Sequence, residues 1–312
     1  ITADTVPLIT ALRGLAGVGY AIATVASLEY LIERQPGHDR ARAMTTFVVV
    51  VIGGTFAGTA LGGILADRLG YGPVFAIGAF MVVVAAVLAW RSLEPTVDPA
   101  DGGETVRFGS SDVVGVLRDS RLMALLAGVT VPMNVALAAF LWYLVPLTLT
   151  AAGESTSVVG RTLMLYYLAV LVAGPLIARL GGARIGTPLL VGAGALISGA
   201  AMFAPVVSSA TLVVSLAVTG VGLGHAAIRA PQLSLAIGLG EARRTTAGRG
   251  ATLAVMRMLE RLGSLAGLLL AAILLAGSDL AVATAAVAMA VSVAAVAYLA
   301  SVLVTVRRVK HA

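Results

Sequence analysis

The chain has 312 residues, of which 59% are hydrophobic and 12% charged, and its net charge is +6. Soluble domains are about 25% charged, so this composition excludes an ordinary water-soluble enzyme, a disordered chain and a nucleic-acid-binding protein. A helix that crosses a bilayer needs about 20 apolar residues, and the chain holds enough for nine. We therefore predict an all-α, polytopic membrane protein, and the 36 glycines are typical of membrane helices.

Nine apolar windows predict nine transmembrane helices, three before and six after a polar stretch. We expect a three-helix part at 1–93 and a six-helix part at 121–312. Between them, at 94–120, we expect a cytoplasmic linker with a short amphipathic helix over Asp112 to Leu117 at the membrane interface. The windows are Leu8 to Tyr30, Thr45 to Ala66, Val74 to Trp90, Leu122 to Leu149, Thr162 to Ala178, Ile185 to Ala204, Ala210 to Leu239, Thr252 to Ala276 and Leu280 to Val306.

The basic residues outside the windows concentrate on alternate connections. Those after the odd-numbered windows carry nearly all of them, whereas the others carry Arg68, with Arg161 at a window edge. Because short cytoplasmic loops are enriched in arginine and lysine, we expect the amino terminus outside and the carboxyl terminus in the cytoplasm. The residues concerned are Arg34, Arg40, Arg42, Arg91, Arg107, Arg118, Arg121, Arg179, Arg184, Arg243, Arg244, Arg249, Arg307, Arg308 and Lys310.

Two short patterns recur six windows later in the chain. Gly17 to Ala21 resembles Gly222 to Ala226, and Gly54 to Gly58 resembles Gly263 to Gly267. A six-plus-six duplication explains this repeat if three helices precede residue 1, and we expect that arrangement; a complete nine-helix protein is the alternative. Parallel repeats of this kind occur in secondary transporters. The chain has no cysteine, so it forms no disulfide framework and no thiolate metal site.

Three segments resemble motifs of the major facilitator superfamily. The run from Ile9 to Ala21, in which glycines follow Arg13 after four and six residues, is similar to the family's fourth-helix motif. Gly54 to Gly63 resembles the fifth-helix antiporter motif, although Thr59 stands where drug-proton antiporters carry proline. Gly174 to Arg184 is similar to the second-half copy of the family's loop motif. The resemblance implies helices four to twelve of a twelve-helix transporter. Glycines that we expect to let helices pack closely are Gly17, Gly19, Gly54, Gly58, Gly62, Gly63, Gly263 and Gly267.

Three charged residues interrupt the eighth window, namely Arg257, Glu260 and Arg261. Their spacing places them on one side of a helix, and Glu260 lies about 12 Å beyond the start of the window. Charge at such depth is costly and marks a functional site by default. The alternative is that Arg257 extends to the cytoplasmic surface and Glu260 is its helix partner.

The seventh window adds His225 and Arg229, and the first adds Arg13. His225 is a candidate proton relay or a histidine hydrogen-bonded to a neighbouring helix. Arg229 lies at a depth similar to that of Glu260, so an ion pair between these helices is geometrically reasonable. The family resemblance implies a role in proton coupling for Arg13; the alternative is an arginine that extends outward.

Polar and aromatic side chains in the windows are candidates for lining a cavity, although aromatic residues near window ends are also typical of the interfacial belt. These candidates are Asn134, Trp142, Tyr143, Tyr166 and Tyr167.

The leading hypothesis is a secondary transporter that works by alternating access, coupled to protons and exporting a small molecule. Uptake of an anionic solute is the alternative favoured by the excess of arginine, and a membrane sensor or scaffold module is a third reading. We expect no enzymatic activity, cofactor or metal. The expected partners are the lipid bilayer, a small solute, protons and the preceding helices, in a multi-pass protein of the cell membrane, in particular a bacterial inner membrane.

Overall fold

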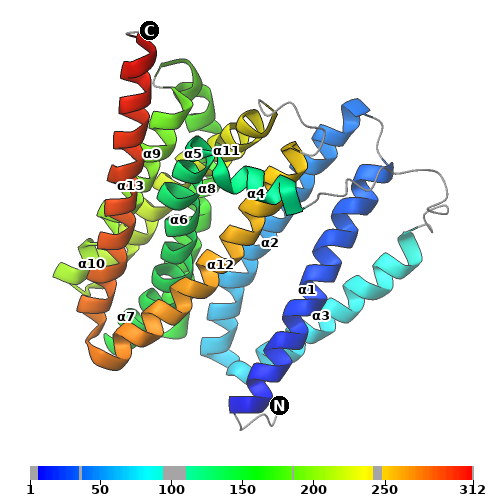
Figure 1. Ribbon diagram of the computed structural model, residues 1–312. Coiled ribbons are helices and arrows are strands. Elements are labelled where there is room, and N and C mark those ends of the chain that lie inside the picture. The colour runs from blue at the N-terminus through cyan, green and yellow to red at the C-terminus, as the bar shows by residue number, and fades with distance from the viewer. Residues whose placement is uncertain (1–5, 35–36, 94–109, 185, 242–247, 311–312) are drawn as a thin grey trace. The chain divides into compact units, whose positions relative to one another are not determined.

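The computed structural model describes residues 6–34, 37–93, 110–184, 186–241 and 248–310, and every regular element in these ranges is a helix (Figure 1). Nine stretches of the described residues are long and apolar enough to cross a membrane. Each overlaps one of the nine windows, so the prediction of an all-α polytopic fold is confirmed. The expected orientation of the termini stays a prediction.

Eight of the nine spans are built on one long helix each. These helices are α1 (Val6–Arg34), α2 (Gly37–Leu69), α3 (Tyr71–Ser92), α8 (Thr156–Arg184), α9 (Thr187–Ala201), α11 (Thr211–Glu241), α12 (Gly248–Gly277) and α13 (Leu280–Lys310). The short helix α10 (Ala204–Val207) completes the span that begins with α9.

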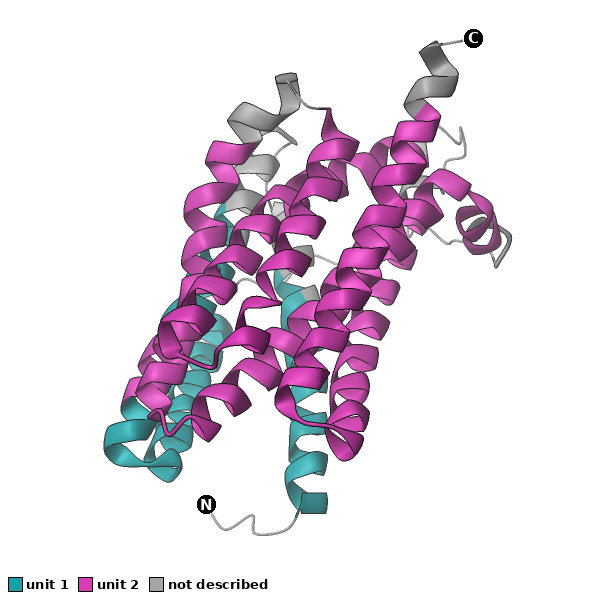
Figure 2. Cartoon of the chain, turned by 90° about the vertical axis from the view of Figure 1, so that its left-hand side faces the viewer, with its two compact units in different colours: residues 1–58, 65–103 teal, residues 59–64, 104–312 magenta. Residues whose placement is uncertain are grey.

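Residues of the chain cluster into two compact units, coloured separately in Figure 2. Unit 1 comprises residues 1–58 and 65–103, and unit 2 comprises 59–64 and 104–312. Helices α1 and α3 contribute no buried residues over their span windows, whereas unit 2 contains a large apolar core. The predicted linker 94–120 lies outside the described residues as far as 109. From there the helix α4 (Ser110–Arg118) includes Asp112 to Leu117, and the linker with its place at a membrane interface stays a prediction.

The span from Ser120 to Ala151 changes helix type four times. It consists of α5 (Ser120–Leu125), the π-helix η1 (Leu126–Thr130), α6 (Val131–Ala136), the π-helix η2 (Leu137–Leu144) and α7 (Val145–Ala151). Each π-helix ends two residues before a proline, Pro132 or Pro146. Proline lacks the N–H that the α-helical ladder needs. The Val131 and Val145 N–H groups instead reach the carbonyls five residues back, at Leu126 and Phe140.

Helix α11 is central to the packing of unit 2, because it contacts α8, α9, α12 and α5. Glycine makes these approaches possible. A Cβ at Gly222 would lie 2.8 Å from the Tyr166 carbonyl oxygen on α8, and one at Gly224 would overlap the Gly194 carbonyl and the Ser198 hydroxyl on α9. The core around these contacts contains large side chains that are fully buried, among them Phe140, Leu141, Leu144, Leu149, Met202 and Ile228.

Candidate functional site

A row of aromatic contacts joins three helices of unit 2, and we call it the aromatic row: Trp142, Tyr167, Tyr166 and His225. The Trp142 and Tyr167 ring centroids are 6.0 Å apart, and those of Tyr167 and Tyr166 are 5.0 Å apart in an edge-to-face arrangement. Tyr166 then stacks on His225 at 5.9 Å. The structure therefore brings together four candidates from η2, α8 and α11.

The inner end of the aromatic row is also hydrogen-bonded. The Tyr166 hydroxyl and the His225 Nδ1 atom are 2.5 Å apart, and the Tyr166 residue is buried. His225 is half-buried, and Arg229 lies one turn further along α11 with an exposed side chain. A histidine bonded to a neighbouring helix is one of the two alternatives that the sequence left open. The same bond also gives the imidazole a proton-carrying partner.

A second group of polar side chains connects α11 to the π-helical span. The buried Gln232 amide donates to the Thr130 hydroxyl at 3.0 Å. The Asn134 amide donates to the Thr130 carbonyl at 2.8 Å. Asn134 thus pairs with its own helix and does not touch the aromatic row through any hydrogen bond of the described residues. Tyr143, the remaining cavity candidate, is half-buried and packs against the apolar core.

On α12, Arg257 and Glu260 form a salt bridge of 2.8 Å between Nη1 and Oε2. The two side chains differ in environment, since Arg257 is 67% exposed and Glu260 is 19% exposed. Arg261 is exposed one residue further on. Within the described residues Glu260 pairs with Arg257 and not with Arg229, so the interhelical ion pair that we considered reasonable is not formed.

Two of the packing glycines in α12 lie against α6 of the same unit. A Cβ at Gly263 would lie 3.0 Å from the Val131 carbonyl oxygen, and one at Gly267 would lie 2.6 Å from the Val135 carbonyl oxygen. Their hydrogen side chains therefore let the two backbones approach closely. Gly63, in the part of α2 that belongs to unit 2, lies against α8, where a Cβ would be 3.0 Å from the Gly160 Cα atom.

The other candidates belong to the α1 and α2 segments, where Arg13 is exposed. The described structure places no atom within 4 Å of a Cβ built at these other packing glycines, so their role stays a prediction. They are Gly17, Gly19, Gly54, Gly58 and Gly62.

Sequence reasoning missed the pair formed by Thr130 and Gln232. The available signal was a polar side chain directly after Pro231 inside an apolar window. Reading that signal from the sequence alone would still have left the partner unknown, because Thr130 is 102 residues away. Among the described residues, no group of three or more His, Asp or Glu side chains is placed to hold a metal ion.

Comparison with known proteins places this helical architecture in a family. No curated protein matches the chain. The family model of the Major Facilitator Superfamily, in contrast, matches residues 1–248 of the 312. That match covers most of the chain and agrees with the nine apolar spans. The chain therefore belongs to the major facilitator superfamily of membrane transporters.

Proposed function

We propose that this chain is a secondary active transporter that works by alternating access, exchanges a small solute for protons and exports that solute. The proposal rests on one observation above all: charged side chains lie deep within the spans of α11 and α12, where the three arginines are exposed and Glu260 is half-buried. The antiporter-like glycine run from Gly54 to Gly63 supports export. We also propose the division into helical parts at 1–93 and 121–312, with a cytoplasmic carboxyl terminus and location in a bacterial inner membrane.

The depth of these charges follows from the span bounds. Glu260 is ten residues, or about 15 Å, from the start of its span at Gly250. Arg229 is eleven residues from the end of its span at Gly240, or about 17 Å. Because α11 and α12 are consecutive spans, their joined ends lie on the same side of the membrane. Arg229, Glu260 and Arg261 therefore lie at similar depth, near the middle of a hydrocarbon layer about 30 Å thick.

The surroundings of α12 differ sharply between its two sides. Its buried side carries small and apolar residues that pack on unit 2, whereas Arg257 and Arg261 lie on the other side. This segregation of polar and apolar side chains is stronger in α12 than in the other long helices described. An arginine facing lipid at the bilayer centre costs about 2.5–3.5 kcal/mol on insertion scales. We infer that the charged side of α12 faces an aqueous solute path instead.

Glu260 is the group that we assign to proton exchange. It is a carboxylate near the middle of a span, and a carboxyl group can carry a proton across one conformational cycle. When ionised, Glu260 is held by the Arg257 guanidinium at 2.8 Å. Protonation removes the charge that the guanidinium attracts, which frees Arg257 for the solute. The Tyr166–His225 pair on α8 and α11 is a second candidate for proton transfer.

The test uses the full chain reconstituted in liposomes that contain a pH-sensitive dye. Ethidium and carboxyfluorescein serve as a cationic and an anionic probe, followed by a wider panel of fluorescent solutes. We expect at least one probe to accumulate in response to an imposed pH gradient, with a matching proton flux that a protonophore abolishes. Saturable flux that is independent of the pH gradient would contradict proton coupling. The absence of saturable flux of every probe in the panel would contradict transport of this solute class.

The excess of positive charge supports uptake of an anionic solute as the second candidate function. Three guanidinium groups, those of Arg229, Arg257 and Arg261, stand against the single carboxylate Glu260 in the described parts of these two spans. Guanidinium groups bind carboxylates and phosphates through paired hydrogen bonds. Inward, proton-driven flux of carboxyfluorescein without flux of ethidium would favour this function over export. The match to a transporter family favours export and uptake alike over a function as a sensor or scaffold module.

A further inference from the structure

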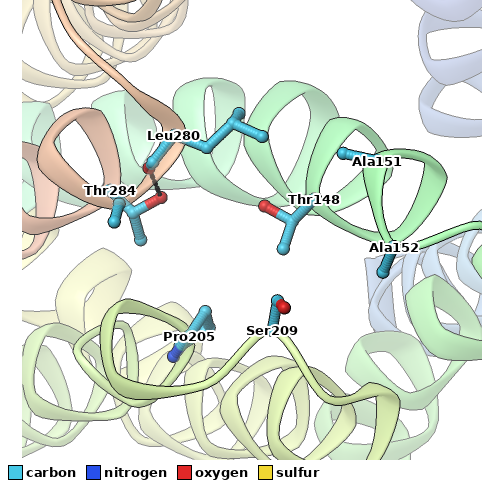
Figure 3. Close-up of a pocket in the computed structure, with 8 residues that line it drawn as sticks. Thr148, Ala151, Ala152, Pro205, Ser209, Leu280 and Thr284 are labelled. Carbon is cyan, nitrogen blue, oxygen red and sulfur yellow. Dashed lines mark hydrogen bonds between the residues drawn. The ribbon is translucent and has the colours of Figure 1, made fainter.

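A pocket lies at one end of unit 2, where α7, α10 and the start of α13 meet (Figure 3). It has a volume of about 210 Å³ and is separate from the charged residues of α11 and α12. Its lining residues are Thr148, Ala151, Ala152, Pro205, Ser209, Leu280, Ala281 and Thr284.

The lining is uncharged and combines methyl groups with three hydroxyl groups. The hydroxyl of Thr284 donates to the Leu280 carbonyl oxygen at 2.6 Å. Several other helical serine and threonine residues described in unit 2 behave in the same way: the hydroxyls of Ser198, Thr219 and Ser264 each donate to the carbonyl four residues back. Such a hydroxyl already has an acceptor and needs none from a ligand.

Thr148 departs from this pattern. The residue is 8% exposed, and its hydroxyl has no hydrogen-bond partner among the described residues. Figure 3 shows the Thr148 side chain projecting from α7 into the open space that faces Ser209 and Thr284. The Thr148 hydroxyl therefore opens onto the pocket with its hydrogen-bonding capacity unused by the described protein, and its orientation points to a hydrogen bond with an occupant.

We propose that this pocket binds a small neutral molecule with an apolar body and one hydrogen-bonding group, which pairs with the Thr148 hydroxyl. The volume equals that of about seven water molecules in the liquid, which suits an aromatic alcohol of about eight heavy atoms. The lining supplies no counter-charge, so a charged molecule of the same size would lose its hydration without compensation. The site is independent of the proposed transport path, because its lining includes none of the charged residues assigned there.

The experiment uses a cysteine reporter, which the cysteine-free chain allows. Ser209→Cys places an exposed thiol on the pocket wall of the full-length, detergent-solubilised chain. Benzyl alcohol is the probe, and the rate of maleimide labelling is measured. We expect benzyl alcohol to slow labelling at least fivefold, toluene to slow it less because it lacks the hydroxyl, and benzoate to have no effect.

Two further variants in the Ser209→Cys background isolate the hydroxyl. Thr148→Val keeps the side-chain shape, and with it benzyl alcohol and toluene should slow the labelling equally. Thr150→Val, at an exposed position of the same helix, should retain the difference between these two compounds. Ser92→Cys, an exposed site outside the pocket, controls for an effect of the probe on the detergent.

Three results would overturn the proposal. The first is labelling of Ser209→Cys that benzyl alcohol does not slow. The second is equal slowing at Ser92→Cys, which would show a general solvent effect. The third is an unchanged preference for benzyl alcohol over toluene after Thr148→Val, which would mean that the Thr148 hydroxyl does not bind the probe. Because these readouts measure protection and not flux, they are independent of the proposed transport function.

Discussion

Replacing Glu260 by glutamine removes a negative charge from the middle of the α12 span while retaining the shape and hydrogen-bonding capacity of the side chain. In the structure that charge contacts Arg257 at 2.8 Å, and the arginine is 67% exposed. The substitution therefore leaves one guanidinium without its partner. The free-energy cost of leaving this guanidinium unpaired depends on whether the exposed side of α12 faces water or lipid. It is small in water and large in lipid.

If the charged side of α12 faces an aqueous path, the lost ion pair resembles a solvent-exposed pair on one helix, worth about 0.3–0.5 kcal/mol. Abundance in the membrane should then fall by no more than about twofold. If Arg257 faces lipid, leaving it unpaired costs up to about 2.5–3.5 kcal/mol. Abundance in the membrane should then fall more than tenfold, since about 1.4 kcal/mol corresponds to a factor of ten. We expect the smaller loss of abundance, because the proposed solute path lies along the charged side of α12.

Two measurements on the same membranes test this prediction. Quantitative blotting gives the abundance of the folded protein, and proteoliposome assays give the pH-driven flux of a transported probe. For Glu260→Gln we expect abundance within about twofold of the unmodified chain and loss of the response to the pH gradient. Asp67→Asn, which makes the same chemical change at an exposed position near the end of the α2 span, should leave both values unchanged.

A different pattern would refute the reasoning. Tenfold lower abundance that Arg257→Gln restores would identify a structural ion pair facing lipid, because the second change removes the unpaired charge. Normal abundance with normal pH-driven flux would show that Glu260 does not carry the coupled proton.

Three further predictions concern packing and topology. Tyr166→Phe leaves the His225 ring nitrogen without its partner and should lower the stability by about 1–3 kcal/mol; an unchanged midpoint of thermal unfolding in detergent would contradict the importance of this bond. Gly224→Ala should reduce membrane abundance strongly because the new Cβ overlaps α9, whereas Gly238→Ala on the same helix, with nothing within 4 Å, should not; equal abundance of the two variants would be the contrary outcome. A cysteine at Ser208 should react with an impermeant thiol reagent outside intact cells, and one at Thr245 should not; outside labelling at Thr245 would reverse the predicted topology.

The number and class of the spans were determined by the sequence alone. Span length and hydropathy are local properties, because a bilayer of fixed thickness requires the same run of apolar residues wherever a helix crosses it. The side of α12 shared by Arg257 and Glu260 also followed from sequence, since residues three apart are neighbours on any α-helix, and the structure pairs them.

The partners between helices were decided by the tertiary structure. Tyr166 and His225 are 59 residues apart, and Thr130 and Gln232 are 102 apart. Most of these helices are apolar on every side, so the periodicity of the sequence does not show which side faces a neighbour. Helix rotation is then set by where backbones can approach, at Gly222 and Gly224 for example. The π-helices before Pro132 and Pro146 also change the rotation per residue along this span. The sides on which the following residues lie therefore differ from those that α-helical periodicity predicts.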